Sequence, residues 1–187
     1  MSLILASQSP RRKELLGLFG VDFSVRVADI DETMDLSADP AAEVARVSRL
    51  KALAVPRGED DVVVAADTIV VCQGKILGKP KDVADAKAML TLLSGRDHQV
   101  MTGMTVLRGQ NIQSCTEVTD LHFRPLSEAE IDRYIASGDP MDKAGSYGIQ
   151  GKAALFVEGI DGDYFNVMGL PLHLLGQMLK DFGVALF

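Results

Sequence analysis

The chain alternates between short apolar runs and amphipathic segments, which is the pattern of a fold that mixes strands and helices. An apolar run at residues 3–6 predicts a short buried strand. Residues 61–71 form the longest β-branched run and predict a strand that is covered on both faces. Two alternating segments, 98–107 and 112–123, are joined by a turn sequence and predict an antiparallel hairpin. Shorter strands are expected at residues 23–27 and 154–158.

Side chains that cap helices mark where the amphipathic segments begin. Two of them precede a proline, which is favoured at the first helical position. Another opens a capping box, in which a glutamate follows the capping serine by three residues. The predicted helices start after Ser9, Asp39, Asp82 and Ser127, and a last one starts at Pro171. The second helix carries Val44, Val47, Leu50 and Ala54 at helical spacing.

This order of elements predicts an α/β fold. Strands and helices alternate in the first half of the chain, and a hairpin then intervenes. We therefore expect a mixed, twisted sheet with flanking helices, arranged as two lobes around a central cleft within a single domain of residues 1–187. A hydrophobic content of 47% in 187 residues is ample for a core.

Composition narrows the location and the partners. Apolar runs of 18 or more residues are absent, and Arg11-Arg12-Lys13 interrupts the start of the chain, so we expect a cytoplasmic protein with no membrane partner. The net charge of −7 argues against a broad nucleic-acid surface but is compatible with a local basic pocket. Cys72 and Cys115 lack the spacing of a zinc site or redox pair, and we expect free thiols.

The start of the first helix has the composition of an anion site. Ser9 and Pro10 leave the N–H groups of the first turn pointing outward, with the positive end of the helix dipole behind them. Arg11, Arg12 and Lys13 add cations where a helix normally prefers acids, which indicates an anion outside the chain. The alternative is an ordinary cap followed by solvated basic residues.

Two further residues stand out by their context. Asp67 interrupts an apolar strand, so its carboxylate must be paired, protonated, metal-bound or located at a break that faces a cleft. The alternative is an aspartate that caps amides at a bulge. Lys79 lies between Gly78 and Pro80 on a constrained loop and is a candidate phosphate contact. The glycine-rich loop at residues 141–151 permits close approach of a ligand, although many such loops only turn corners.

The motifs of several enzyme classes are absent, namely the phosphate loop, the nucleophile elbow, the zinc-protease motif and the dinucleotide fingerprint. The three histidines are scattered and favour structural or surface roles. What remains is a set of loop and helix-start cations with two carboxylates, which are the parts that phosphoanhydride hydrolysis requires. These residues are Arg11, Arg12, Lys51 and Lys79, with Glu32 and Asp67.

Six sequence segments follow one another along the chain: Ser7-Gln8-Ser9-Pro10-Arg11-Arg12 with Glu14-Leu15-Leu16, Asp31-Glu32, residues 44–52, Ala66-Asp67-Thr68 with Gly78-Lys79-Pro80, residues 145–151 and residues 166–171. Together and in this order they resemble the motifs of the Maf family of nucleotide pyrophosphatases, in the form of the dTTP/UTP subfamily. Gln8 and Val47-Ser48 depart from the commoner residues of the family, and neither removes a charged group.

The resemblance implies hydrolysis of a nucleoside triphosphate to the monophosphate and pyrophosphate, with Mg²⁺ or Mn²⁺. It implies that Asp67 is the catalytic proton acceptor or a metal ligand, with Glu32 nearby as a second metal ligand. A homodimer is compatible with it. The phosphate contacts that it implies are Ser7, Arg11, Arg12, Lys51 and Lys79.

The Tyr-Gly-Ile-Gln-Gly sequence at residues 147–151 is similar to the branch that acts on dTTP and UTP. By this resemblance Arg11, Thr68 and Gln150 are the specificity positions, and a glutamine amide suits the carbonyl and ring N–H of a pyrimidine. Two alternatives stay open: the same chemistry on 7-methyl-GTP, and a regulator of cell division that binds nucleotides without hydrolysing them.

Overall fold

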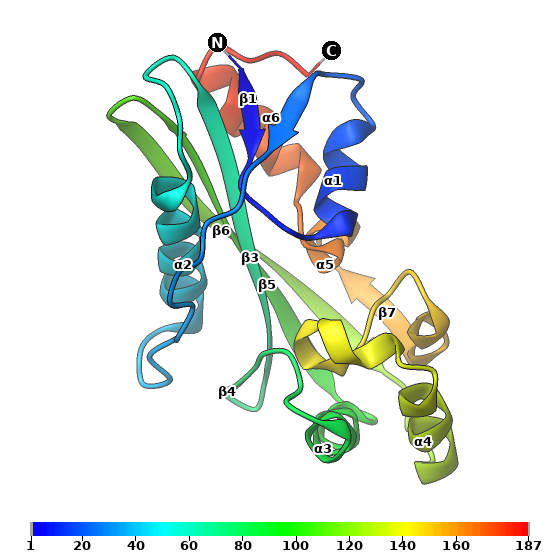
Figure 1. Cartoon of the computed structure of the whole chain (residues 1–187). Coiled ribbons are helices and arrows are strands. Elements are labelled where there is room, and N and C mark those ends of the chain that lie inside the picture. Colours follow the sequence, from blue (N-terminus) through cyan, green and yellow to red (C-terminus); the bar gives the residue numbers. More distant parts are fainter. Residues whose placement is uncertain (1, 187) are drawn as a thin grey trace. The chain divides into compact units, whose positions relative to one another are not determined.

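The computed structural model describes residues 2–186, and within them a seven-stranded mixed sheet is flanked by helices (Figure 1). Its strands are β1 (Leu3–Leu5), β2 (Phe23–Val25), β3 (Val62–Cys72), β4 (Lys75–Leu77), β5 (Asp97–Arg108), β6 (Asn111–Phe123) and β7 (Val157–Asp161). They lie in the order β2-β1-β3-β5-β6-β7, with β4 paired to β3. β1 is parallel to β2 and β3, whereas β4 is antiparallel to β3 and β7 to β6. The predicted α/β class and mixed sheet are confirmed.

The helices begin where the capping side chains predicted. They are α1 (Pro10–Gly17), α2 (Pro40–Ala54), α3 (Val83–Leu93), α4 (Glu128–Ala136), α5 (Tyr164–Met168) and α6 (Leu172–Asp181), with the 3-10 helices η1 (Asp139–Asp142), η2 (Ala144–Ser146) and η3 (Lys152–Phe156). Each predicted cap accepts a hydrogen bond from a backbone N–H of its first turn. The four caps are Ser9, Asp39, Asp82 and Ser127.

The chain divides into two compact units, each made of separate stretches of sequence. The first contains the chain as far as Asp67, Thr102–Glu117 and the part from Gly169 onward. The second contains Thr68–Met101 and Val118–Met168. Strands β3, β5 and β6 contribute residues to both units. The cleft between two lobes and the single domain of residues 1–187 stay predictions.

In the first unit, α2 packs directly on the sheet. The apolar cluster between them contains Ile4, Ala52, Val55, Val63, Ala65 and Leu107. Figure 1 shows α2 on one side of the strands of this unit and α1 with α6 on the other. A β-carbon at Gly103 of β5 would collide with the backbone carbonyl of Val44 in α2. Glycine at this position therefore lets the helix that carries Lys51 rest against β5.

The buried face of α2 differs in part from the prediction. Leu50 and Ala54, expected on the apolar stripe, are exposed. The buried residues are Glu43, Val44, Val47, Ser48 and Ala52. At 3.6 residues per turn, position 51 follows positions 44 and 47 on one face, so Lys51 starts from the sheet-facing side of the helix.

The strand predicted at residues 154–158 begins later in the structure, and its first three residues are helical. Lys152–Phe156 form η3, and β7 begins only at Val157. Ala153 and Phe156 are buried whereas Leu155 is 75% exposed. Burial every third residue is the period of a 3-10 helix, whereas a strand alternates every second residue.

Two expectations from composition can be compared with the described residues. Cys72 is buried, Cys115 is partly buried, and both are free thiols as predicted. Among residues 2–186, none of the helices combines the length and apolar character needed to cross a bilayer.

Candidate functional site

The first unit brings several predicted site residues to one end of its parallel strands. β1 lies between β2 and β3, and its two neighbours are reached through α1 and α2, so β1 is a switch point of the kind where open α/β sheets bind ligands. Ser7 follows the end of β1 by two residues. Leu5 of β1 is opposite Val64 of β3, which places Asp67 three residues further along β3, toward the same end.

Arg12 is the buried cation of this end. Its side chain donates through Nε to the carbonyl oxygen of Gly169 at 2.7 Å and through a terminal nitrogen to Oγ of Ser7 at 3.2 Å. The Ser7 hydroxyl oxygen also accepts from the backbone N–H of Ser9. Burial lowers the pKa of Arg12 from its ordinary value, and the negative charge of Asp67 opposes that shift. An arginine stays protonated even so, which gives a fixed charge beside a fixed hydroxyl.

The three cations of the first turn are therefore not equivalent. Arg12 is turned inward and has partners within the chain, whereas Arg11 is partly exposed and Lys13 is exposed. Two of the Arg12 nitrogens bind protein oxygens, and the prediction that this turn holds its cations for an outside anion stays a prediction. Part of the role of Arg12 is to hold Ser7 and the segment at Gly169 in place.

Lys51 bridges the two carboxylates that the sequence singled out. Its Nζ lies 2.6 Å from Oδ1 of Asp67 and 3.0 Å from Oε2 of Glu32. The side chains of Lys51 and Asp67 are 16% and 14% exposed, whereas that of Glu32 is 55% exposed. Of the alternatives for an aspartate inside an apolar strand, the structure shows the paired one. Ion pairs shielded in this way lose less to solvent screening than surface pairs do.

The loop that carries Glu32 is held by a pair that sequence reasoning missed. Arg46 donates to the carbonyl oxygen of Thr33 at 2.8 Å and to both carboxylate oxygens of Glu43. Glu43 in turn accepts from the backbone N–H of Asp35. The spacing of three residues between Glu43 and Arg46 on a predicted helix was the available signal, because such residues are neighbours on a helix surface.

The donor set of Glu32 and Asp67 fits a divalent cation such as Mg²⁺ or Mn²⁺. Both ligands are carboxylates, and Mg²⁺ takes one or two protein carboxylates and completes its shell with waters and phosphate oxygens. Within residues 2–186, His, Cys, Asp and Glu side chains are nowhere gathered in threes that could hold a metal ion. The ammonium of Lys51 contacts both carboxylates, and the predicted metal ion stays a prediction.

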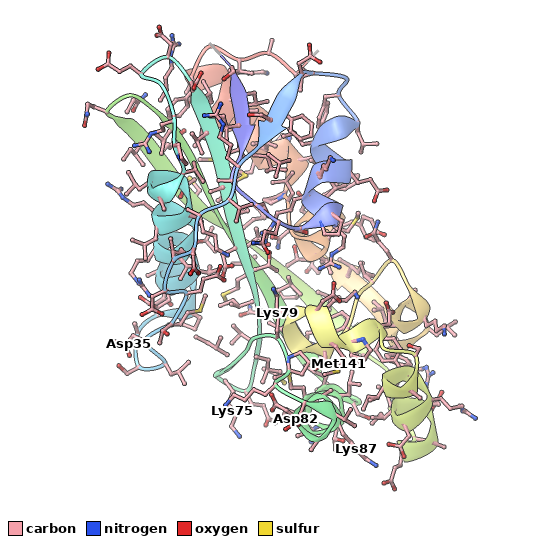
Figure 2. All side chains as sticks on the ribbon, viewed as in Figure 1. Asp35, Lys75, Lys79, Asp82, Lys87 and Met141 are labelled. Atoms are coloured by element: carbon pink, nitrogen blue, oxygen red, sulfur yellow. The ribbon has the colours of Figure 1, made fainter. Side chains whose placement is uncertain are left out.

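The remaining predicted residues belong to the second unit. Thr68 is partly exposed in β3, and Lys79 is exposed on the segment between β4 and α3 (Figure 2). Gln150 is exposed in a turn before η3. The loops of Lys79 and Gln150 are linked, because the backbone N–H of Gly145 donates to the carbonyl oxygen of Gly78 at 3.0 Å. The predicted contacts of these three residues with a substrate stay predictions.

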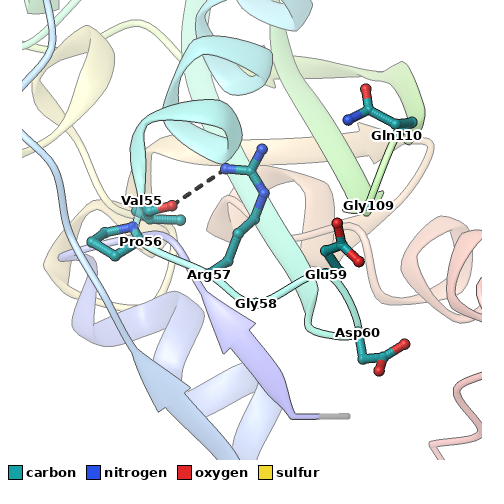
Figure 3. Close-up of a pocket in the computed structure, with 8 residues that line it drawn as sticks. All are labelled: Val55, Pro56, Arg57, Gly58, Glu59, Asp60, Gly109 and Gln110. Carbon is teal, nitrogen blue, oxygen red and sulfur yellow. Dashed lines mark hydrogen bonds between the residues drawn. The ribbon is translucent and has the colours of Figure 1, made fainter.

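A separate hollow in the first unit takes in none of these residues. It has a volume of about 700 Å³ and is lined by residues 55–60 together with Gly109 and Gln110 (Figure 3). Arg57 is one of the residues that line this pocket. It donates to the carbonyl oxygen of Val55, the hydrogen bond drawn as a dashed line in Figure 3. Glu59 and Asp60 add exposed carboxylates, so its lining is unsuited to a triphosphate.

Comparison with characterised proteins gives long, closely related matches. A protein of Bacillus pumilus named dTTP/UTP pyrophosphatase is 50% identical over 186 residues, which cover 99% of this chain and 98% of that protein. A protein of Symbiobacterium thermophilum with the same name is also 50% identical, over 99% of this chain and 96% of its own length. A third, from Bacillus cytotoxicus, is 51% identical over 96% of this chain and 94% of its own.

Solved structures agree on the fold. The Ham1 protein of Staphylococcus aureus superposes with a TM-score of 0.53 at 14% identity, covering 97% of this chain and 99% of that one. A HAM1 protein of Coxiella burnetii gives 0.50 at 15% identity with the same coverage. The profile described as Maf-like protein matches residues 2–182. The chain therefore belongs to the Maf-like protein family.

Proposed function

We propose that this protein is a nucleoside triphosphate pyrophosphatase that converts dTTP or UTP, and modified pyrimidine triphosphates, to the monophosphate and pyrophosphate. The observation that carries the proposal is an identity of about 50% to proteins named dTTP/UTP pyrophosphatase over almost the whole of both chains. The grouping of Lys51, Asp67 and Glu32 supports it, because it joins a cation and two carboxylates beside a switch point of the sheet.

The phosphate chain of the substrate is held by fixed donors. Ser7 and Arg12 are already oriented by hydrogen bonds within the chain, so little ordering is needed when a triphosphate binds. Arg11 lies one residue before Arg12 on the same first turn, at the positive end of the α1 dipole. Lys51 and Lys79 complete the set of cations that neutralise the pyrophosphate as it leaves.

Asp67 accepts the proton of the attacking water, or it would hold a divalent ion together with Glu32. The water forms a bond to the α-phosphorus, the bond from that phosphorus to the bridging oxygen breaks, and the electron pair leaves with pyrophosphate. Glu32 and Asp67 would hold a divalent cation, which would supply charge neutralisation of the phosphate oxygens. The contact with Lys51 fixes the Asp67 carboxylate in one orientation before substrate arrives.

Base selection is assigned to Arg11, Thr68 and Gln150. The amide of Gln150 offers one acceptor and two donor hydrogens, which match the carbonyl and ring N–H of thymine and uracil. A guanine methylated at N7 presents a different edge and is expected to be a poor substrate. This is the point at which the proposal departs from 7-methyl-GTP hydrolysis.

The test is a substrate panel. The protein is incubated with dTTP, UTP, dCTP, ATP, GTP and 7-methyl-GTP, with Mg²⁺, with Mn²⁺ and with a chelator, while monophosphate, pyrophosphate and orthophosphate are measured. We expect pyrophosphate from dTTP and UTP only when a divalent cation is present. Release of orthophosphate, or no turnover of either pyrimidine, contradicts the proposal, and undiminished turnover with chelator contradicts the metal.

A matched pair of variants separates hydrolysis from nucleotide binding. Asp67→Asn keeps the size of the side chain, and we expect binding by calorimetry to persist while turnover falls by roughly 10²- to 10⁴-fold. Asp132→Asn removes an exposed carboxylate of α4 and is expected to leave both unchanged. Undiminished turnover of the Asp67 variant would contradict the catalytic role of Asp67, whereas nucleotide binding without turnover in the wild type would favour a non-catalytic nucleotide-binding role. The cytoplasmic location and the homodimer stay predictions.

A further inference from the structure

The turn that carries Gln150 is closed by glycines at both ends. The backbone N–H of Gly151 donates to the carbonyl oxygen of Gly148 at 3.1 Å, so Ile149 and Gln150 form the two central positions. Ile149 is buried and Gln150 is exposed. The position of the exposed amide therefore depends on how firmly the two glycines are seated.

Each glycine of this turn rests on a charged side chain. A β-carbon at Gly148 would lie 2.7 Å from Cδ and Cε of Lys143. A β-carbon at Gly151 would lie 2.8 Å from Oδ2 of Asp139. Both distances are shorter than real contacts of a β-carbon, so a larger residue at either position would have to displace the Lys143 or the Asp139 side chain.

The two charged side chains that support the glycines are paired with each other. Nζ of Lys143 lies 3.2 Å from Oδ1 of Asp139 and also donates to the backbone carbonyl oxygen of Asp139. A third contact joins it to Oδ1 of Asp142 at 2.7 Å. The Lys143 side chain is only 14% exposed, so it is held in one position, unlike a mobile surface lysine.

A hydrogen bond to Tyr134 of α4 also holds this turn in place. The backbone N–H of Gly148 donates to the phenol oxygen of Tyr134 at 3.2 Å. Burial raises the pKa of Tyr134, so the phenol stays neutral at physiological pH. Gly148 thus has a polar anchor on one side and the methylene chain of Lys143 on another.

We propose that Lys143 and Asp139 are positioning residues for Gln150, and that their ion pair sets the base selectivity of the enzyme. The inference deepens the proposed function and rests on the assignment of Gln150 to the base. Neither residue is assigned a contact with the substrate. Without the ion pair, the turn at residues 148–151 is free to change position. The amide of Gln150 then no longer selects one base by its pattern of hydrogen-bond donors and acceptors.

Two variants of Lys143 separate the effect of its charge on selectivity from the effect of its side-chain size. Lys143→Met keeps a long unbranched chain under Gly148 and removes the ion pair, whereas Lys143→Ala removes both. We expect the ratio of kcat/KM for UTP to that for CTP to fall roughly tenfold in Lys143→Ala, the size of one lost hydrogen bond, and less in Lys143→Met. The loss should lie mainly in KM for UTP, because base contacts are made in ground and transition states alike.

A second measurement compares the selectivity of a single variant at Gly148 with that of a double variant at Gly148 and Lys143. Gly148→Ala should lower selectivity because its methyl group displaces the Lys143 chain, and adding Lys143→Ala should restore part of the loss. The control is Lys87→Met on α3, which removes an exposed lysine paired with Glu128 and Asp132 (Figure 2). It should leave selectivity unchanged.

Hydrogen exchange of the Gly151 amide reports the turn without any turnover. Protection should fall in both Lys143 variants and stay at the wild-type level in Lys87→Met. If the wild type is active and Lys143→Ala has the same ratio of kcat/KM for UTP and CTP, the positioning role is overturned. If the exchange rate of the Gly151 amide is unchanged in the Lys143 variants, Lys143 does not hold the turn in place. A wild-type protein that hydrolyses no triphosphate overturns the proposed function instead, which the exchange result distinguishes.

Discussion

Arg12 and Gly169 are 157 positions apart, and Nε of Arg12 donates a 2.7 Å hydrogen bond to the carbonyl oxygen of Gly169. The contact joins the first helix of the chain to the segment just before its last one, both within the first unit. One guanidinium thus serves two purposes, since it also donates to the Ser7 hydroxyl that we assign to the phosphates. Stability and substrate binding are expected to depend on the same side chain.

Replacing Arg12 by lysine should therefore affect both properties. Lysine keeps the charge but cannot donate to both the Gly169 carbonyl oxygen and the Ser7 hydroxyl as the guanidinium does. Arg12→Lys therefore leaves a buried oxygen without its donor. We expect a loss of about 1–3 kcal/mol in the free energy of unfolding by urea, together with a higher KM. The matched control is Arg57→Lys, because Arg57 also donates to backbone carbonyls but is partly exposed, unlike the buried Arg12. Equal losses in both variants would contradict the role assigned to Arg12.

Lys51 should be more important for stability than an exposed lysine with two acidic partners. Lys51→Met removes the ammonium that pairs with the shielded Asp67 carboxylate, whereas Lys87→Met leaves only exposed carboxylates unpaired. We expect a loss of about 1–3 kcal/mol for the first and less than about 0.5 kcal/mol for the second in urea titrations at pH 7. If the two variants unfold at the same urea concentration, the pairing of Lys51 with Asp67 contributes nothing to stability.

Gly103 should not tolerate a methyl group. Because a β-carbon there would meet the Val44 carbonyl, Gly103→Ala must move α2 off β5, with an expected loss of about 3 kcal/mol in unfolding free energy. Gly176 in α6 offers the opposite case, with no heavy atom within 4 Å of its β-carbon position. Gly176→Ala should stabilise by up to about 1 kcal/mol, as expected in a helix interior. A Gly103→Ala protein as stable as wild type would contradict the packing of α2.

His98 should make stability fall in mild acid. Burial lowers its pKa to about 4, and its Nε2 lies 2.8 Å from the hydroxyl of Tyr147. Because the unfolded histidine binds a proton near pH 6.5 and the folded one does not, stability is full above pH 6.5 and is lost as pH falls toward 4, by about 3 kcal/mol. The opposite shift of His122, whose pKa Asp97 raises, works against this trend.

The variant that isolates this effect is His98→Gln, which can still bond Tyr147 but does not titrate. Unfolding free energies of wild type and variant are compared from pH 7.5 to 4.5. The decline should be shallower in the variant. Parallel curves would mean that His98 is protonated equally in both states.

Local features of the fold could be predicted from the sequence because their causes are local. Ser9, Asp39, Asp82 and Ser127 cap helices through side chains that accept from amides three residues away, and no distant contact is needed. The strand predicted at residues 154–158 was placed too early because Ala154, Leu155 and Phe156 are apolar in either structure, and the backbone N–H of Ala154 instead donates to the carbonyl oxygen of Gly151.

The candidate site residues could be named from the sequence, but their pairing could not. Asp67 and Lys51 were identified, yet the sequence could not show that they contact each other, since this depends on α2 lying against β5 at Gly103. For the same reason the supports of Glu32 and of the Gln150 turn were missed. Arg46 and Lys143 act through neighbours that only the folded chain brings within reach.

The division of the first unit has a consequence for protein synthesis. That unit needs the part of the chain from Gly169 onward, whereas every residue of the second unit lies at or before Met168. On a ribosome, the second unit is therefore fully made while the first still lacks α6 and the Gly169 carbonyl that Arg12 binds. The contact of Arg12 with Gly169 can therefore form only after the whole second unit has been synthesised.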